Sequence, residues 1–425
     1  KEMMMSRSSN TRRSKSTNAV GVLVVLGAVL CLGIVFITTG ADPLGLFEDT
    51  GTPTSAAQVQ VPTNTPKSSS GAVTLEAEPP STADWYEVGF VTPIRVRAAE
   101  EVEYGENGIP AEILQGSLAE KLIQKIDQAK TSIHIASFET DMADIANALI
   151  RAHKRGVDVR WITDDEFGTE ADEKPGHGQF GLMEKAGIEI IDDQRGGLMH
   201  NKFWIFDGET VWTGSTNITI SGMFEQDNNL IVIESKDLAA IYEQQFEEMW
   251  NGEFGARSPS DVENQKVVIN DTPIQVLFAP EDKPIEHILP YVQNARRNIR
   301  FLAFSYTHPD LGSAMLDRLA NGVTIHGVFE TVGSDTEYSE MMPLHCAGGN
   351  MRQDTNFAFL HHKVMIIDNR YVVTGSLNFS DSANTKNNEN VIIIDNREIA
   401  KLYLDEFERI WKISADLDPA EFKCP

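Results

Sequence analysis

The sequence predicts an α/β fold made of two tandem copies of one unit, here called the first and the second repeat. The segment FEEMW at residues 246–250 recurs as FERIW at 407–411, an offset of 161. Upstream, SIHIASFETD from Ser132 resembles NIRFLAFSYT from Asn298 at an offset of 166. The first repeat therefore holds five extra residues, which we place in the acidic loop 164–178. A constant register over so many residues indicates a structural duplication.

Strands and helices are expected to alternate within each repeat. Short apolar runs are typical of buried strands, and apolar residues at helical spacing are typical of helices packed on a sheet. In the first repeat we expect strands at 133–138, 157–162, 188–191, 203–206 and 230–233, and helices at 141–154 and 236–250. In the second repeat we expect strands at 299–304, 323–329, 364–367 and 391–394, and helices near 310–320 and 398–411. This alternation predicts a largely buried sheet covered by helices. Residues 252–271 are the expected junction.

The N-terminal region is expected to lie outside the repeats. Residues 19–39 are apolar almost throughout and long enough to span a bilayer as one helix. The basic residues in 1–18 predict a cytoplasmic stub, so the catalytic region would be extracytoplasmic. A cleaved signal peptide, with secretion of the rest, is the alternative. Residues 40–84 are rich in Thr, Ser, Pro and Ala and predict a flexible linker. The repeats would then occupy 85–256 and 257–425.

The charge balance restricts the class of partner. The chain has 36 Lys and Arg against 63 Asp and Glu, a net charge of −27. Residues 1–18 carry +4, which leaves −31 for the rest. Such an excess argues against a general nucleic-acid coat protein, which needs a basic face. Three cysteines (Cys31, Cys346 and Cys424) are too few for a disulfide scaffold and lack zinc-ligand spacing. A bridge between Cys346 and Cys424 is left open.

One polar motif occurs once in each repeat. In the first, His200 and Lys202 precede an apolar run that ends at Asp207, and Gly-Ser215-x-Asn217 follows. The second repeat has the same pattern in His361, Lys363, Asp368, Ser376 and Asn378. Residues i and i+2 of a strand share a face, so each His lies beside its Lys. One imidazole surrounded by ammonium, hydroxyl and amide donors suits an anionic tetrahedral ligand such as a phosphodiester.

These paired motifs resemble those of the phospholipase D superfamily, over roughly residues 86–414. The resemblance implies two phospholipase D-like α/β repeats, each a mixed, mostly buried sheet covered by helices. It also implies a pseudo-twofold arrangement with the active site between them. In the reaction that the resemblance implies, one His attacks phosphorus to form a phosphohistidine, and the other protonates the leaving alcohol and later activates water. That reaction is expected to use no metal or other cofactor, with the Lys and Asn side chains holding the phosphoryl oxygens. The family's usual nucleophile, the first motif's His, maps to His200.

The resemblance assigns candidate roles to twelve residues. The catalytic candidates are His200, Lys202, Asp207, His361, Lys363 and Asp368, and the phosphate-binding candidates are Ser215, Asn217, Ser376 and Asn378. Family members carry a carboxylate 28 residues after each motif His, which orients the His of the opposite half. That position is Glu389 in the second repeat and Asn228 in the first. We expect Glu389 to orient His200, and His361 to pair with the neutral Asn228. Asp207 and Asp368 are explained more simply as turn caps than as catalysts.

Three functions fit the motif. We favour a membrane-anchored phospholipase D that hydrolyses a phospholipid headgroup, because the acid excess disfavours polyanions and the anchor at 19–39 brings the site near lipids. A metal-independent DNA or RNA nuclease is the alternative, and a non-catalytic phosphate- or lipid-binding protein is a third. Both motifs lie in one chain, so a monomer is expected to suffice. The headgroup, and the choice between water and an alcohol as acceptor, stay open.

Overall fold

The computed structural model describes residues 82–96, 108–258 and 262–424. The predicted cytoplasmic stub, the anchor at 19–39 and the linker up to residue 81 lie outside the described residues. No helix in the described ranges is both long and apolar enough to cross a membrane.

The first repeat forms a mixed sheet of eight strands in the order β1-β2-β8-β7-β6-β3-β4-β5. Its strands are β1 (Thr82–Ala83), β2 (Tyr86–Phe90), β3 (Ser132–Ser137), β4 (Asp158–Thr163), β5 (Glu189–Asp192), β6 (Lys202–Phe206), β7 (Thr210–Gly214) and β8 (Asn229–Glu234). β3, β4 and β5 are parallel, and the other neighbours are antiparallel. The end of the predicted linker thus joins the sheet as β1.

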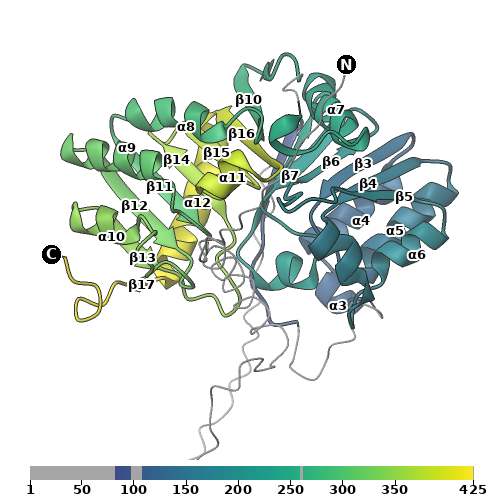
Figure 1. Cartoon of the computed structure of the whole chain (residues 1–425), viewed down its shortest axis with the longest axis horizontal. Helices are drawn as coiled ribbons and strands as arrows, with labels where there is room; N and C mark the ends of the chain where they lie inside the picture. Colours follow the sequence, from purple (N-terminus) through teal and green to yellow (C-terminus); the bar gives the residue numbers. More distant parts are fainter. Residues whose placement is uncertain (1–81, 97–107, 259–261, 425) are drawn as a thin grey trace, which may run out of the picture. The chain divides into compact units, whose positions relative to one another are not determined.

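The second repeat forms a nine-stranded sheet with the equivalent order, β17-β13-β12-β11-β14-β15-β16-β10-β9. Its strands are β9 (Lys266–Ile269), β10 (Thr272–Ala279), β11 (Asn298–Ala303), β12 (Thr324–Phe329), β13 (Asn350–Gln353), β14 (Lys363–Ile367), β15 (Tyr371–Gly375), β16 (Glu389–Asp395) and β17 (Ala415–Asp416). The parallel trio β11-β12-β13 matches β3-β4-β5. The predicted α/β fold with two mixed sheets is therefore confirmed (Figure 1).

Four helices recur in matched positions (Figure 1): α4 (Leu118–Gln128), α5 (Ala143–Lys154), α6 (Gln179–Lys185) and α7 (Lys236–Trp250) of the first repeat match α8 (Pro284–Gln293), α9 (Pro309–Ala320), α10 (Met341–Cys346) and α12 (Arg397–Ile413) of the second. The short helices α3 (Ala111–Leu114) and α11 (Asp381–Thr385) do not match each other, and a π-helical turn (Ser221–Glu225) takes the place of α11 in the first repeat. The two long helices begin alike, since Ser235 caps α7 by accepting from Leu238 N and Asn396 caps α12 by accepting from Glu398 N and Ile399 N.

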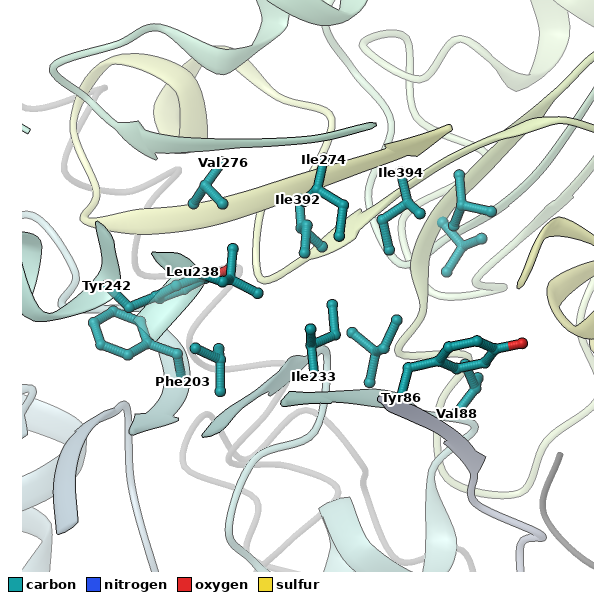
Figure 2. Packing of buried hydrophobic residues seen from close by; sticks show 14 of the residues in the cluster. Tyr86, Val88, Phe203, Ile233, Leu238, Tyr242, Ile274, Val276, Ile392 and Ile394 are labelled. Carbon is teal, nitrogen blue, oxygen red and sulfur yellow. The ribbon is translucent and has the colours of Figure 1, made fainter. Parts of the chain in front are cut away.

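Apolar residues form one core outside each sheet and a third core shared by the two repeats. In the shared core, side chains of the first repeat face those of the second (Figure 2). The residues labelled there are Tyr86, Val88, Phe203, Ile233, Leu238, Tyr242, Ile274, Val276, Ile392 and Ile394. This core therefore packs one face of each sheet against the other repeat.

Some elements differ from the sequence prediction. The expected junction at 252–271 is too long, because β9 within it pairs with β10 and belongs to the second sheet. Helices α4 and α8 and strands β2 and β10 were not expected. The extra residues of the first repeat form a π-helical turn (Asp165–Thr169) and a 3₁₀ turn (Glu170–Glu173) after β4.

Candidate active site

The two motif histidines meet where the repeats contact each other. His200 and His361 lie two residues before Lys202 and Lys363, which are the first residues of β6 and β14. The backbone N–H of His200 donates to Asn388 O at 2.9 Å, and that of His361 donates to Asp227 O at 2.9 Å. Each motif is thus bound to the backbone of the opposite repeat, which brings both histidines to one site.

Glu389 of the second repeat holds His200 of the first. Its Oε2 lies 2.8 Å from His200 Nδ1, and it also accepts from Ser376 Oγ at 2.6 Å. Asn387 Nδ2 donates to the other carboxylate oxygen at 3.1 Å. A carboxylate can only accept here, so Nδ1 carries the proton and Nε2 keeps its lone pair. The contact expected between Glu389 and His200 is present.

Asn228 takes the corresponding place beside His361. Its Oδ1 lies 2.9 Å from His361 Nδ1 and accepts from Ser215 Oγ at 2.8 Å, while its Nδ2 donates to Gly222 O at 3.0 Å. The carbonyl oxygen of Ser215 lies 3.1 Å from the same Nδ1. Both neighbours are acceptors, so His361 also has its proton on Nδ1. The two histidines thus share a tautomer but differ in the charge of the partner.

The two motif serines differ from the prediction that they bind phosphate. Ser215 and Ser376 are fully buried, and their hydroxyl groups donate to Asn228 and Glu389. They therefore orient the residues that hold the histidines. The glycine before each serine is needed for this packing, because a Cβ on Gly214 would lie 2.3 Å from Asn229 O and one on Gly375 would lie 2.2 Å from Asn390 O.

Each motif lysine lies between its own histidine and an aromatic ring. Lys202 Nζ donates to His200 O at 2.9 Å and lies 5.2 Å from the ring centre of Phe138. Lys363 Nζ donates to His361 O at 2.8 Å, and Phe304 is 4.6 Å away. Burial lowers the pKa of Lys202 to about 8 and lowers that of Lys363 well below its usual value. An anionic ligand would offset this burial and favour the charged ammonium groups.

The two aromatic rings were not among the predicted site residues. Phe138 and Phe304 also contact the edges of His200 and His361, with ring centres 5.0 and 4.9 Å apart. Each phenylalanine follows the strand next to the motif strand, β3 or β11. Their shared offset of 166 is the signal that could have identified them.

The two motif asparagines have different surroundings. Asn217 donates from Nδ2 to Glu139 Oε1 at 2.7 Å. In the second repeat, Ser305 occupies the position that matches Glu139 at the offset of 166. The Oδ1 atoms of both asparagines are buried without a hydrogen-bond partner in the described part of the chain. Glu139 is a further residue that the motif analysis missed.

The two motif aspartates lie at the far end of their strands and away from the histidines. Asp207 accepts from the backbone N–H groups of residues 130–132 at 2.7–3.2 Å, and Asp368 accepts likewise from residues 296–298. Burial alone would raise the pKa of Asp207, but the hydrogen bonds outweigh it and lower this pKa. The geometry therefore places neither Asp207 nor Asp368 beside the reacting groups. Both carboxylates cap turns, as the alternative interpretation predicts.

Burial also sets the protonation of the histidines. It lowers the pKa of His200 to about 4, although Glu389 acts in the opposite direction. Burial and the two lysines lower the pKa of His361 well below its usual value, and its Nδ1 is held by Asn228 and the Ser215 carbonyl. Both rings are thus neutral at pH 7 in the free site.

Two buried carboxylates hold the residue before each histidine. Asp164 accepts from Met199 N at 3.0 Å, and Glu330 accepts from Leu360 N at 2.7 Å. They match at the offset of 166, directly after β4 and β12. Burial raises their pKa values to about 6 and about 8. The sequence analysis did not identify this pair, although the repeat register contains it.

Two groups of side chains have the donor types of a metal site. They are Asp164 with Asp165 and Asp193, and His134 with Glu243 and Glu247. Arg195 pairs with Asp193 at 2.9 Å, and Arg160 pairs with Glu247 at 3.2 Å. An arginine therefore already neutralises one carboxylate in each group, which makes both poorer cation sites.

Comparison with known proteins agrees with this geometry. A family model described as "Cardiolipin synthase, PLD-like domain" matches residues 122–250 and 288–411, more than half of the chain. The mitochondrial cardiolipin hydrolase of Xenopus tropicalis is 33% identical over 141 residues, which are 33% of this chain and 66% of that protein. A phospholipase D of Rickettsia prowazekii is 28% identical over 134 residues, 32% of this chain and 65% of that one.

A solved structure shows the same fold over most of the chain. The phosphatidylserine synthase of Haemophilus influenzae aligns with a TM-score of 0.56 and 13% identity, covering 72% of this chain and 86% of that chain. The chain spans only about half to two thirds of the length of the curated relatives that it matches. From the family model, the paired motifs and the two matched sheets together, the chain belongs to the phospholipase D superfamily, with two phospholipase D-like repeats in one polypeptide.

Proposed function

We propose that this protein is a phospholipase D-type phosphodiesterase that hydrolyses the headgroup phosphodiester of phospholipids. The observation that carries the proposal is the pairing of two His–Lys motifs across the repeats. Both histidines have their Nδ1 atoms held by acceptors from the opposite repeat, so both Nε2 atoms can act on one phosphorus. The relatives named cardiolipin hydrolase and phospholipase D support a lipid substrate.

The proposed reaction has two steps. His200 Nε2 attacks phosphorus, the bond from phosphorus to the headgroup oxygen breaks, and His361 gives that oxygen a proton. In the second step His361 takes a proton from water, the oxygen attacks phosphorus, and the P–N bond breaks to restore His200. Glu389 stabilises the positive charge on the phosphohistidine, and the ammonium groups of Lys202 and Lys363 stabilise the negative charge on the phosphoryl oxygens. No step requires a metal ion.

The protonation of His361 depends on the substrate. The free site holds His361 neutral, so the acid form must be created when the substrate binds. A phosphodiester anion beside the ring raises its pKa and replaces the charge that Asn228 does not provide. His200 needs no such change, because a neutral ring with a free Nε2 is the form that attacks.

The proposal includes a location outside the cytoplasm, on a membrane anchor at residues 19–39. The disulfide between Cys346 and Cys424 supports it, because such bonds persist in oxidising compartments. The exposed apolar side chains of Val332 and Phe357 support contact with lipid. Glu330 connects the loops that carry these two side chains, because its carboxylate accepts hydrogen bonds from both Val332 N and Leu360 N, the latter next to His361.

The substrate is tested by incubating the full chain in detergent micelles with phosphatidylcholine and, separately, with a single-stranded oligonucleotide, each with EDTA present. We expect choline release and no cleavage of the oligonucleotide. Cleavage of the oligonucleotide alone would replace the proposal with a nuclease. Binding of phosphate without turnover of either substrate would indicate a non-catalytic phosphate-binding protein.

The nucleophile is tested with a phospholipid labelled with ³²P. We expect His361→Ala to form labelled protein slowly, because the leaving oxygen lacks its acid, and then to retain the label, because hydrolysis of the intermediate lacks its base. His200→Ala should accumulate none. The reverse pattern would exchange the roles of the two histidines.

A further inference from the structure

Asn388, the residue before the carboxylate that holds His200, is fixed by an arginine of the first repeat. Asn388 is fully buried; its N–H donates to Leu198 O at 2.8 Å, and its carbonyl oxygen accepts from His200 N at 2.9 Å. Arg195 Nη2 donates to Asn388 Oδ1 and, at 3.3 Å, to Leu198 O. Its Nη1 donates to Lys386 O at 3.0 Å. Arg195 therefore attaches the segment that carries the partner of His200 to the first repeat.

Asp227 has the corresponding place beside His361, because it precedes the amide that holds this ring. Its N–H donates to Phe359 O and its carbonyl oxygen accepts from His361 N, each at 2.9 Å. Its buried carboxylate accepts from Asn356 Nδ2 at 2.7 Å and from Arg409 Nη2. Arg409 belongs to α12 of the second repeat. It therefore attaches the segment that carries the partner of His361 to the second repeat.

The two arginines occupy different positions of the repeat. At the offset of 161, Arg195 matches Asn356, and both donate to the carbonyl and to the side chain at matching positions. Arg409 matches Glu248 on α7. The repeat register therefore pairs neither arginine with the other. Only their contacts show that both hold the residue before the partner of a histidine.

Each arginine thus controls the orientation of one histidine without touching the substrate. The segment that it holds supplies the carbonyl that binds the histidine N–H and, one residue later, the side chain that binds Nδ1. A shift of this segment turns the imidazole and moves its Nε2 away from the phosphorus. Misplacement of a reacting atom by about 1 Å lowers a rate by about a hundredfold, so such a contact has a measurable kinetic effect.

We propose that Arg195 and Arg409 are positioning residues, each of which aligns one histidine and thereby supports its own part of the reaction. The inference rests on the proposed phosphodiesterase mechanism and deepens it. Arg195 supports the attack of His200 on phosphorus. Arg409 supports the two proton transfers of His361, to the leaving oxygen and from water.

A substrate with an activated leaving group separates the two roles. The p-nitrophenyl ester of phosphatidic acid releases p-nitrophenolate, which leaves without a proton from His361, whereas hydrolysis of the phosphohistidine still needs His361 as base. The full chain in detergent micelles is mixed rapidly with this ester, and the burst and the steady rate of release are recorded. Arg409→Gln should keep the burst and lower the steady rate about 10- to 100-fold. Arg195→Gln should show no burst and a similarly low rate from the start.

A second pair of variants guards against misfolding, because loss of either guanidinium removes the partner of buried carboxylates. Arg409 Nε donates to Glu406 Oε2 at 2.7 Å in addition to its contact with Asp227, and Arg195 Nε lies 2.9 Å from Asp193 Oδ2. The second pair therefore also replaces these carboxylates by amides: Asp193→Asn with Arg195→Gln, and Asp227→Asn and Glu406→Gln with Arg409→Gln. Each should repeat the time course of the corresponding single variant.

Lys401→Gln is the control, because it removes a charge from α12 at an exposed ion pair with Asp405. It should change neither the burst nor the steady rate. The inference is overturned if the Arg195 and Arg409 variants give the same time course, because a general loss of stability acts on both phases alike. An exchange of the two time courses would uphold both arginines as positioning residues and exchange the roles of the histidines. Absence of turnover by the wild-type protein would refute the proposed function, and the inference with it.

Discussion

His200 and His361 occupy equivalent places in the two repeats, yet one is paired with a carboxylate and the other with an amide. The resemblance to the phospholipase D superfamily, whose members carry a carboxylate 28 residues after each motif His, was sufficient to predict both partners, Glu389 and Asn228. The role of Ser215 and Ser376 could not be predicted in the same way. Spacing identifies a hydroxyl near a site, but only packing decides that it donates to Asn228 or Glu389 and not to a phosphate.

Asn228→Asp should move the pH dependence of the reaction. A carboxylate beside His361 Nδ1 favours the imidazolium form and raises the pKa of this ring. The limb of the kcat/KM profile that reports the general acid should therefore shift to higher pH. The matched variant Glu389→Gln should lower the pKa of His200. A profile of Asn228→Asp that overlays the wild-type profile would show that His361 is not the acid.

Asp207→Ala should reduce stability and leave the chemistry intact. The substitution removes the acceptor for three backbone N–H groups, which should lower the free energy of unfolding by about 1–3 kcal/mol. Because the pKa of Asp207 is lowered in the folded state, its stabilisation exists above the unfolded pKa and is lost as the pH falls through the folded pKa. Urea unfolding measures the first effect. A large loss of kcat per folded molecule would instead show that Asp207 takes part in catalysis.

Among the elements, those that carry the motif were the easiest to predict. β6 and β14 are apolar runs buried on both faces, and periodicity identifies such strands readily. The strands β2 and β10 are paired on the edge side of β8 and β16, far from their partners in sequence. The segment YEVGF alternates apolar and polar residues, so its strand pattern was present in the sequence, but its pairing with β8 is set only by the tertiary structure. Helix α4 is amphipathic, so the sequence does contain the apolar spacing that predicts it.

The disulfide connects α10 to the C-terminal segment across 78 residues of sequence. Cys424→Ser should lower the free energy of unfolding by about 2–4 kcal/mol, because the unfolded chain regains the freedom of a large closed loop. Reduction of the wild-type protein should have the same effect. Cys31→Ser, outside the described residues, is the control and should not change stability. Equal stability of oxidised and reduced protein would contradict the expectation.

At the scale of the whole molecule, the described repeats share one hydrophobic core, so their folding should be coupled. Phe278 of the second repeat contacts Phe203 and Tyr242 of the first, with ring centres 6.3 and 5.4 Å apart. The duplication was predictable from the register, but the composition of this shared core was not, because apolar periodicity does not tell which face meets another repeat.

Phe278→Ala should lower the free energy of unfolding by about 3–5 kcal/mol. Both repeats should still unfold together, because each loses part of the same core. In a Trp411→Phe background tryptophan fluorescence follows the first repeat, which holds the other five tryptophans, and loss of phosphodiesterase activity follows the assembled site. The two transitions should coincide in urea. Two separate transitions would show that the repeats are independent folding units.

The connection of both repeats in one chain has a consequence for how the site can evolve. Two identical subunits related by a twofold axis would give their histidines identical neighbours, so any change that improved a nucleophile would equally change the acid. A tandem chain removes this constraint, because each position can vary alone. The difference between Glu389 and Asn228, and that between Glu139 and Ser305, are changes that a symmetric dimer could not make. Covalent linkage thus allows two repeats of the same architecture to carry different residues at equivalent positions and to take different roles.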